Sequence, residues 1–206
     1  MATLRIRERL RAAKPGKILL ELVIVFVGVY AAFVLNNYQA ERQAARSRGH
    51  VIELLRVGLD RYEKLFAGFV LRHDNTNPQF RAALDRGELP AFGDDFYPAP
   101  QYPIEMIDHV VTQESYGVFS VDVYVPLIAF QNALRRLMYV EEKLVELSTA
   151  SEPLPPADHP DHSWVRARQE QRAERYYRYL EIRRRTSQEL AERAKAIGEQ
   201  LDALAK

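Results

Sequence analysis

The sequence ILLELVIVFVGVYAAFVL, residues 18–35, decides the fold of this chain. Glu21 is the only charged residue in it. An α-helix rises about 1.5 Å per residue, so this segment makes a helix of about 27 Å, close to the roughly 30 Å hydrocarbon core of a bilayer. The segment therefore predicts one transmembrane helix that lies in the lipid bilayer. No later segment is apolar for long enough to cross again.

Basic residues precede this segment, and the residues that follow it have mixed charges. The basic residues are Arg5, Arg7, Arg9, Arg11, Lys14 and Lys17. Lys and Arg close to a span are retained in the cytoplasm. We therefore expect residues 1–17 to be a cytoplasmic tail and residues 36–206 to be an extracytoplasmic, periplasmic domain of a single-pass protein of the bacterial inner membrane.

A cleavable signal peptide also has a basic start and an apolar middle. The apolar run here is longer than the core of a typical signal peptide, and residues 36–41 lack a small-x-small cleavage site. We therefore interpret residues 18–35 as a retained signal anchor.

The chain contains no cysteine, which excludes disulfides, thiolate metal sites and attachment of a lipid to cysteine.

The charge balance of the whole chain bears on its partners. Lys and Arg number 29 and Asp and Glu number 28, for a net charge of +1. A chain without a basic surplus has no general signature of polyanion binding. Nucleic acid is therefore not a predicted partner.

The residues after the span are mostly helical by period. Apolar residues spaced by three and four predict a helix that continues from the span to about Arg72; they are Ile52, Leu55, Leu59, Tyr62, Phe66 and Phe69. Residues 73–78 are turn formers and predict the end of that helix. Short helices are expected at 79–87, stopped at Gly87, and at 104–116.

Two more long helices follow. One is expected from near Pro126 to about Leu147, and the last from about Ser163, as its cap, to Leu204. The proline-rich residues 151–160 predict a stiff connection between them. The last helix has a coiled-coil seam interrupted by Arg183 and Ser187. Its other seam positions are Ala173, Tyr176, Leu180, Leu190, Ala194, Ile197, Leu201 and Leu204.

Together these elements predict an all-α chain. Three long helices on short or stiff connections favour an elongated antiparallel bundle in which successive long helices alternate in direction. In that arrangement the connection at 151–160 lies near the bilayer. The loop at 90–103 then lies at the far end of the bundle.

The residues around the span resemble a known family. Glu21 to Val29, then Ala31-Ala32 and Asn36-Asn37-Tyr38, are similar to the amino-terminal signature of an uncharacterised bacterial family of small single-pass membrane-anchored proteins. Members typically show Gly-Glu, an Ile/Val-rich span with an internal glycine, and Asn-Asn-Trp. Leu20 and Tyr38 replace that Gly and that Trp here. The segment from Ser115 to Phe119 resembles a Ser-Gly segment of the family. The resemblance implies the membrane topology and no activity.

Three residues of the span are candidates for interaction within the membrane. Glu21 lies one turn inside it, where a carboxylate marks a partner or extends toward Lys17 at the interface. Gly28 and Ala32 form a small-x-x-x-small pair, which allows two helices to approach closely. Self-association through this pair is one expectation.

The loop at 90–103 is the candidate recognition element. Its prolines forbid a long helix, and they alternate with the aromatic residues Phe92, Phe96, Tyr97 and Tyr102. Aromatic side chains on an ordered loop offer apolar contact area with few flexible torsions. The alternative is that these residues close the end of the bundle as part of its core.

A run of arginines opens the last helix. Arg166, Arg168, Arg172 and Arg175 are candidates for contact with an anionic surface, either lipid head groups or an acidic protein. The alternative is a solvated helix face, because glutamates alternate with these arginines.

The remaining polar residues give little support for catalysis or metal binding. Asp158, His159, Asp161 and His162 form the tightest cluster of possible metal ligands, but their spacing matches no metal motif. His73 and His109 have no evident nucleophile, and Ser115 lacks the setting of a hydrolase elbow. We therefore expect no catalytic residue, metal or cofactor.

These observations favour a non-enzymatic, single-pass envelope protein that assembles with itself or serves as an accessory subunit of another membrane protein. The alternative is an extracytoplasmic ligand-binding or sensory module, in which a small molecule enters between the helices or beneath the aromatic loop. Such a module would need a partner to signal, because only residues 1–17 are expected inside.

Overall fold

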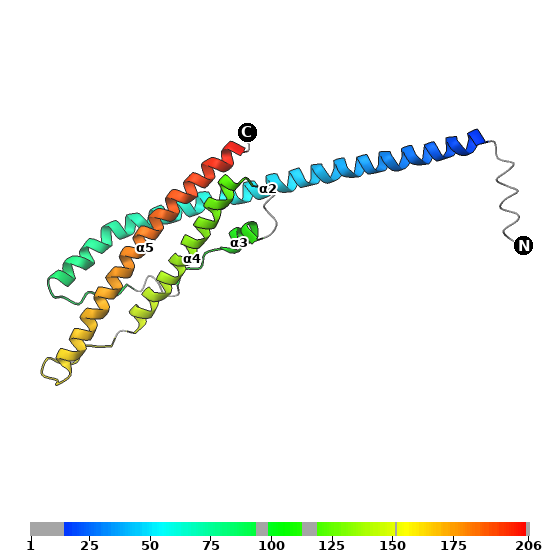
Figure 1. Cartoon of the computed structure of the whole chain (residues 1–206). Helices are drawn as coiled ribbons and strands as arrows, with labels where there is room; N and C mark the ends of the chain where they lie inside the picture. Colours follow the sequence, from blue (N-terminus) through cyan, green and yellow to red (C-terminus); the bar gives the residue numbers. More distant parts are fainter. Residues whose placement is uncertain (1–14, 94–98, 113–118, 151, 205–206) are drawn as a thin grey trace, which may run out of the picture. The chain divides into compact units, whose positions relative to one another are not determined.

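The computed structural model describes residues 15–93, 99–112, 119–150 and 152–204. Within these ranges the chain is all-α, as predicted, and contains no strand. The helices there are α2 (Pro15–Asp85), α3 (Glu105–Thr112), α4 (Val121–Thr149) and α5 (His162–Leu204) (Figure 1). The chain divides into two compact units, Met1–His50 and Val51–Lys206.

The described part of the first unit is the apolar beginning of α2. Its most apolar stretch of 18 residues has a mean hydropathy of 1.9, and none of these residues is buried. Phe26, for example, is 70% exposed. Pro15 suits the first position of a helix because its fixed φ is helical and its missing N–H would have no partner there. Among the described residues, α2 is the one helix that is long and apolar enough to span a membrane.

In the second unit α2 continues beyond the point where the sequence predicts its end. Residues 73–78 are helical, and α2 runs through Pro78 to Asp85, so the predicted break and the separate helix at 79–87 are wrong. A proline inside a helix costs about 3 kcal/mol. Side chains of this stretch offset that cost by bonding to α5, since Asn77 donates to Glu181 at 2.7 Å. Gly87 lies just beyond the helix end, where a stop was predicted, and its φ of +72° is a conformation that favours glycine.

The other helices agree with the predictions except at their ends. α3 covers the first part of the helix expected at 104–116, and residues 113–116 lie outside the described ranges. α4 begins at Val121, more than a turn before Pro126, and ends at Thr149. α5 begins at His162, so Ser163 lies inside its first turn and is not its cap.

Apolar stripes of α2, α4 and α5 form the core of the second unit. Each fully buried leucine or phenylalanine contributes about 1.5–3 kcal/mol by leaving water. The main core residues are Leu55, Leu59 and Phe66 of α2, Leu127, Phe130, Leu134 and Leu137 of α4, and Leu190, Ala194, Ile197 and Leu201 of α5. The predicted seam of α5 is buried against its own chain, except for Leu204, which is exposed.

The directions of the long helices differ from the prediction. Along α2 and α5 the ion pairs join Arg56 to Asp202 and Arg81 to Glu174, so residue numbers fall along α5 as they rise along α2. Along α4 and α5 the pairs join Arg136 to Glu189 and Glu141 to Arg183. Both α2 and α4 therefore run opposite to α5. The alternation predicted between α2 and α4 is wrong.

The described residues between α2 and α4 explain this arrangement, because their contacts lie progressively farther back from the end of α2. Phe92 packs on Tyr176, Tyr102 contacts Phe66, and Asp108 accepts a hydrogen bond from Arg135. α4 can then start at the end of the unit where residue 51 lies.

The connection between α4 and α5 consequently lies at the end of the unit where α2 stops. Arg166 donates to the carbonyl of Gly87 at 2.9 Å. Residues 151–160 and the loop at 90–103 were expected at opposite ends of the bundle, but Phe92 of that loop packs on Tyr176 of α5. That expectation is wrong.

Candidate functional site

A buried polar network lies at the centre of the second unit, with Arg183 of α5 at its middle. Its side chain is 3% exposed and pairs with Glu141 of α4, which is fully buried. Arg183 donates to Glu141 Oε1 from Nε at 2.9 Å and approaches the same oxygen from Nη2 at 2.8 Å. The hydroxyl of Tyr102 donates to that oxygen at 2.7 Å. The guanidinium also lies 4.1 Å from the centroid of the Phe69 ring.

The network continues into α2 through a histidine. Arg183 Nη1 lies 2.7 Å from His73 Nε2, which accepts the bond because a guanidinium has only donors. His73 Nδ1 therefore carries the ring proton and donates to Asn77 Oδ1 at 3.0 Å. Asn77 in turn donates to Glu181 of α5. This chain of bonds joins α2, α4, α5 and the segment that contains Tyr102.

Burial changes the proton affinities in this network. Loss of water lowers the pKa of His73 to about 4, and the neighbouring charge of Arg183 adds to the effect. Burial raises the pKa of Glu141, while Arg183 and the Tyr102 hydroxyl oppose the increase. Burial and the nearby Glu141 also raise the pKa of Tyr102. His73 is therefore neutral in this network at neutral pH.

The sequence pattern located only part of this network. Arg183 and Ser187 were recognised as polar residues in the α5 seam, and both are buried. Glu141 was missed, although its spacing from Leu137 and Leu144 places it on the buried stripe of α4. Glu141 Oε2 and Ser187 Oγ have no hydrogen-bond partner among the described residues. The network is enclosed within the unit, so its hydrogen bonds and ion pair act between α2, α4 and α5 and hold these helices in position.

The aromatic segment contributes partly to the core. Tyr102 is buried, and Phe92 is half-buried with its ring centroid 4.8 Å from that of Tyr176. These positions favour the core interpretation for those two residues. Phe96 and Tyr97 lie outside the described ranges.

A pocket of 410 Å³ lies between α2 and the segment that precedes α3. Its lining is mainly apolar and consists of Gly58, Arg61, Tyr62, Leu65, Phe69 and residues 100–103. Tyr62 is buried, and its hydroxyl has no hydrogen-bond partner among the described residues. Apolar pockets with few polar groups are typical sites for small molecules.

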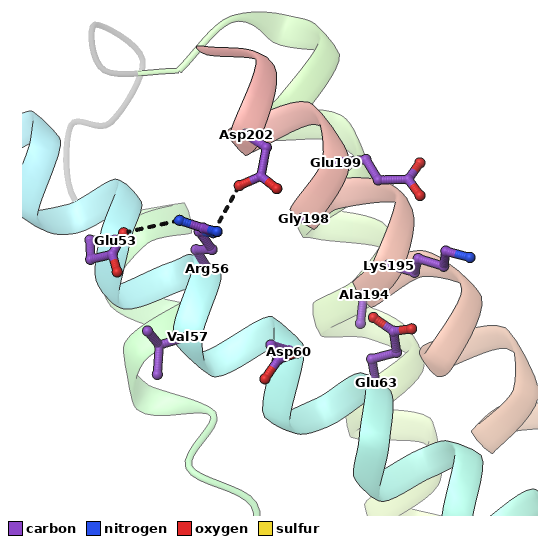
Figure 2. Close-up of a pocket in the computed structure, with 10 residues that line it drawn as sticks. All are labelled: Glu53, Arg56, Val57, Asp60, Glu63, Ala194, Lys195, Gly198, Glu199 and Asp202. Atoms are coloured by element: carbon purple, nitrogen blue, oxygen red, sulfur yellow. Dashed lines mark ion pairs between the residues drawn. The ribbon is translucent and has the colours of Figure 1, made fainter. Parts of the chain in front are cut away.

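A second concavity, of 570 Å³, lies between α2 and α5 (Figure 2). Carboxylates outnumber cations in its lining. The acidic residues are Glu53, Asp60, Glu63, Glu199 and Asp202, and the basic residues are Arg56 and Lys195. Arg56 joins the two sides by pairing with Asp202 at 2.8 Å and with Glu53 at 3.7 Å. The lining also includes the small residues Ala194 and Gly198 (Figure 2). We call this concavity the acidic groove.

The structure brings three of the four predicted arginines together. Arg168, Arg172 and Arg175 line a pocket of 240 Å³ between the end of α4 and the beginning of α5. Arg166 is used differently, because it pairs with Glu170 at 3.0 Å and donates to the Gly87 carbonyl. The arginine run is thus divided between a helix connection and a pocket.

The candidates within the predicted span are all exposed. Glu21, Gly28 and Ala32 lie on α2, and a Cβ added at Gly28 would meet no atom within 4 Å. These three positions are therefore available to lipid or to another helix.

The histidines of the proline-rich connection make local bonds. His162 Nδ1 donates to the Pro155 carbonyl at 2.7 Å, and His159 Nδ1 accepts from the N–H of Asp161 at 3.2 Å. Among the described residues no group of three or more His, Cys, Asp or Glu could hold a metal ion.

The sequence matches no family model, no curated protein and no solved structure. The described chain is thus defined by one exposed apolar helix segment and by a helical unit with a buried ionic network.

Proposed function

We propose that this chain is a non-enzymatic single-pass membrane protein whose helical unit acts as an assembly or accessory subunit. The observation that carries the proposal is the exposed apolar surface of α2 from Leu20 to Leu35. An α-helix that is apolar on every side is stable only in lipid or inside a larger assembly.

The proposed topology places residues 1–17 in the cytoplasm and the unit after residue 50 outside the inner membrane, as a mainly antiparallel bundle of helices. The basic residues before the span support this orientation. The resemblance of the span to the uncharacterised family of small membrane-anchored proteins is consistent with the same topology.

Residues within the span support assembly with another helix. Gly28 and Ala32 lie on one face, since four residues turn a helix by about 40° beyond a full circle. A small pair allows close backbone contact in lipid, where packing drives association. Glu21 carries a carboxylate that a polar group of a partner helix would stabilise.

The test is the mass of the full-length protein, purified in mild detergent from its native membrane, with its companions identified. We expect a discrete complex, either homomeric or with a second membrane protein. Gly28→Leu should dissociate it, whereas Val23→Leu, on the opposite helix face, should not. A monomer without companions would contradict assembly. Equal migration of both variants and wild type would contradict assembly through Gly28.

The apolar pocket beside Tyr62 supports a second candidate function, the binding of a small amphipathic molecule. Its walls offer aromatic and aliphatic surface, Arg61 offers a charge, and the Tyr62 hydroxyl has no partner in the described structure. A ligand with an apolar body and one polar group would match these features.

Thermal unfolding of the full-length protein with a panel of amphipathic envelope metabolites tests this candidate. A ligand that fits should raise the unfolding temperature of wild type and not of Leu65→Trp, which fills the pocket. Leu71→Trp is the matched control, because Leu71 is exposed on the same helix and does not line the pocket. An increase that survives Leu65→Trp, or no increase with any compound, would count against this pocket.

A further inference from the structure

The pocket between the end of α4 and the beginning of α5 is strongly basic. Arg168, Arg172 and Arg175 line it, together with Glu146, Leu147 and Gln171. The three arginines are spaced by four and three residues, so they project from one face of α5. Three guanidinium groups therefore border a single concavity.

Two of these arginines have no counter-charge within the described structure. Arg172 and Arg175 have no carboxylate within 4 Å among the described residues. Other arginines of the unit do have one, such as Arg81 with Glu174 and Arg184 with Asp74. The pocket therefore has a positive charge that nearby acidic residues do not neutralise.

The other charged groups of the pocket are already engaged. Glu146, the acidic residue of its lining, is bonded to Lys143. Arg168 lies 3.6 Å from Glu152 and stacks over the Trp164 ring at 5.3 Å from its centroid. These contacts restrain Arg168 at one edge. Arg172 and Arg175 remain available to an incoming anion.

The size of the pocket limits what can occupy it. Its volume of 240 Å³ is below the roughly 300 Å³ typical of sites for drug-sized molecules. A helix is about 10 Å wide with its side chains and does not fit such a space. The occupant is therefore a small group, and the forked guanidinium donors match phosphate oxygens in pairs.

We propose that Arg168, Arg172 and Arg175 form a binding site for a phosphate group, carried either by a soluble compound or by a phospholipid head group. Gln171 supplies an additional amide donor at the rim. The pocket adjoins the negative end of the α4 dipole, which opposes an anion, so the attraction for phosphate comes from the arginine side chains. This proposal does not rest on assembly of the chain, since every residue of the site belongs to one copy.

The test is isothermal titration of the full-length protein in neutral detergent at fixed ionic strength. Sodium pyrophosphate represents the soluble source and dihexanoyl phosphatidylglycerol the lipid source. The double variant Arg172→Gln/Arg175→Gln removes the two available cations. The matched control, Arg178→Gln/Arg185→Gln, removes the same charge from exposed positions of α5 outside the pocket.

We expect the pocket variant to bind at least one of the two probes about tenfold or more weakly than wild type, and the control variant to bind as wild type does. Loss confined to pyrophosphate identifies a soluble phosphate ligand, and loss confined to the lipid identifies a head group. Equal weakening in both variants would reduce the effect to general surface charge and overturn the proposal. Absence of binding of both probes to wild type would overturn it as well. Circular dichroism of each variant separates loss of binding from loss of folding. Arg168→Gln changes the third cation alone and gives a second, independent variant of the pocket.

Discussion

Arg183 and Glu141 form an ion pair inside the helical unit, with Nη2 and Oε1 2.8 Å apart and the side chains 3% and 0% exposed. Taking two charges out of water is costly, and their attraction offsets that cost only when further hydrogen bonds satisfy both groups. Tyr102 supplies such a bond to Glu141 Oε1 and His73 supplies one to Arg183, while Glu141 Oε2 has no partner among the described residues. Arg183 therefore satisfies its charge within its own chain.

Removal of one member of this pair should be far more damaging than removal of both. We expect Arg183→Met and Glu141→Leu each to lower the free energy of unfolding by about 3–5 kcal/mol, because each leaves a buried charge without its partner. The double variant should lose less than either single variant, because no charge of the pair then remains buried. Urea unfolding in mild detergent, followed by circular dichroism, measures this cycle.

The matched control is Arg136→Met. Arg136 pairs with Glu189 at 3.7 Å on the surface, so its loss should change the free energy by about 0.5 kcal/mol or less. Strictly additive losses at Arg183 and Glu141 would show that the two residues are not coupled.

His73 should make the stability of the unit depend on pH. Its pKa is lowered to about 4 in the folded protein, against 6.5 ordinarily, so the unfolded chain binds a proton that the folded chain does not between those values. Stability should therefore be complete above pH 6.5 and should fall by about 2–4 kcal/mol as the pH drops to 4. Arg183, Asn77, Arg72 and Glu181 are the groups that act on the ring.

The difference between wild type and His73→Gln isolates this effect from the titration of carboxylates. The variant should lose less stability than wild type between pH 6.5 and 4. His109→Gln, at an exposed position, should follow the wild-type curve. A wild-type curve parallel to that of His73→Gln would refute the role of His73.

Gly198 offers a simple test of whether the acidic groove is open. A Cβ at this helical position would meet no atom within 4 Å, and alanine is favoured over glycine inside a helix by about 1 kcal/mol. Gly198→Ala should therefore stabilise the protein by about 0.5–1 kcal/mol. Ala196→Gly, at an exposed neighbouring position of α5, should destabilise it by a similar amount. A loss of stability in Gly198→Ala would indicate that the groove is occupied in the assembled protein.

The absence of cysteine makes the proposed orientation testable without removing any native residue of that type. Single cysteines at Ala2 and at Asp158 should react differently with a membrane-impermeant maleimide applied to intact spheroplasts. Asp158 is exposed in the connection between α4 and α5, so Asp158→Cys should be labelled directly. Ala2→Cys should be labelled only after permeabilisation. The reverse pattern would place the helical unit in the cytoplasm.

Local patterns in the sequence predicted the helices better than their limits. The period of the apolar residues in α4 and α5 was sufficient to place both helices within a few residues. Residues 73–78 were misread because turn propensity is local. The contacts that keep them helical join Asn77 to Glu181 and His73 to Arg183, across 104 and 110 residues of chain.

The candidate sites show the same division. The arginine run was visible in the sequence, but only the position of α4 brings Glu146 and Leu147 beside Arg172 and creates a pocket. Glu141 has the spacing of a core residue, and its role depends on which cation lies opposite.

By itself, the sequence determined the apolar segment that can span a membrane, the all-α class and the buried stripe of each long helix, because length, hydropathy and period act within one segment. Tertiary structure alone decided that α2 and α4 run in the same direction, that α2 continues through Pro78, and that Arg183 pairs with Glu141. These outcomes depend on contacts between residues distant in the chain, where packing and the desolvation of charge outweigh local preference.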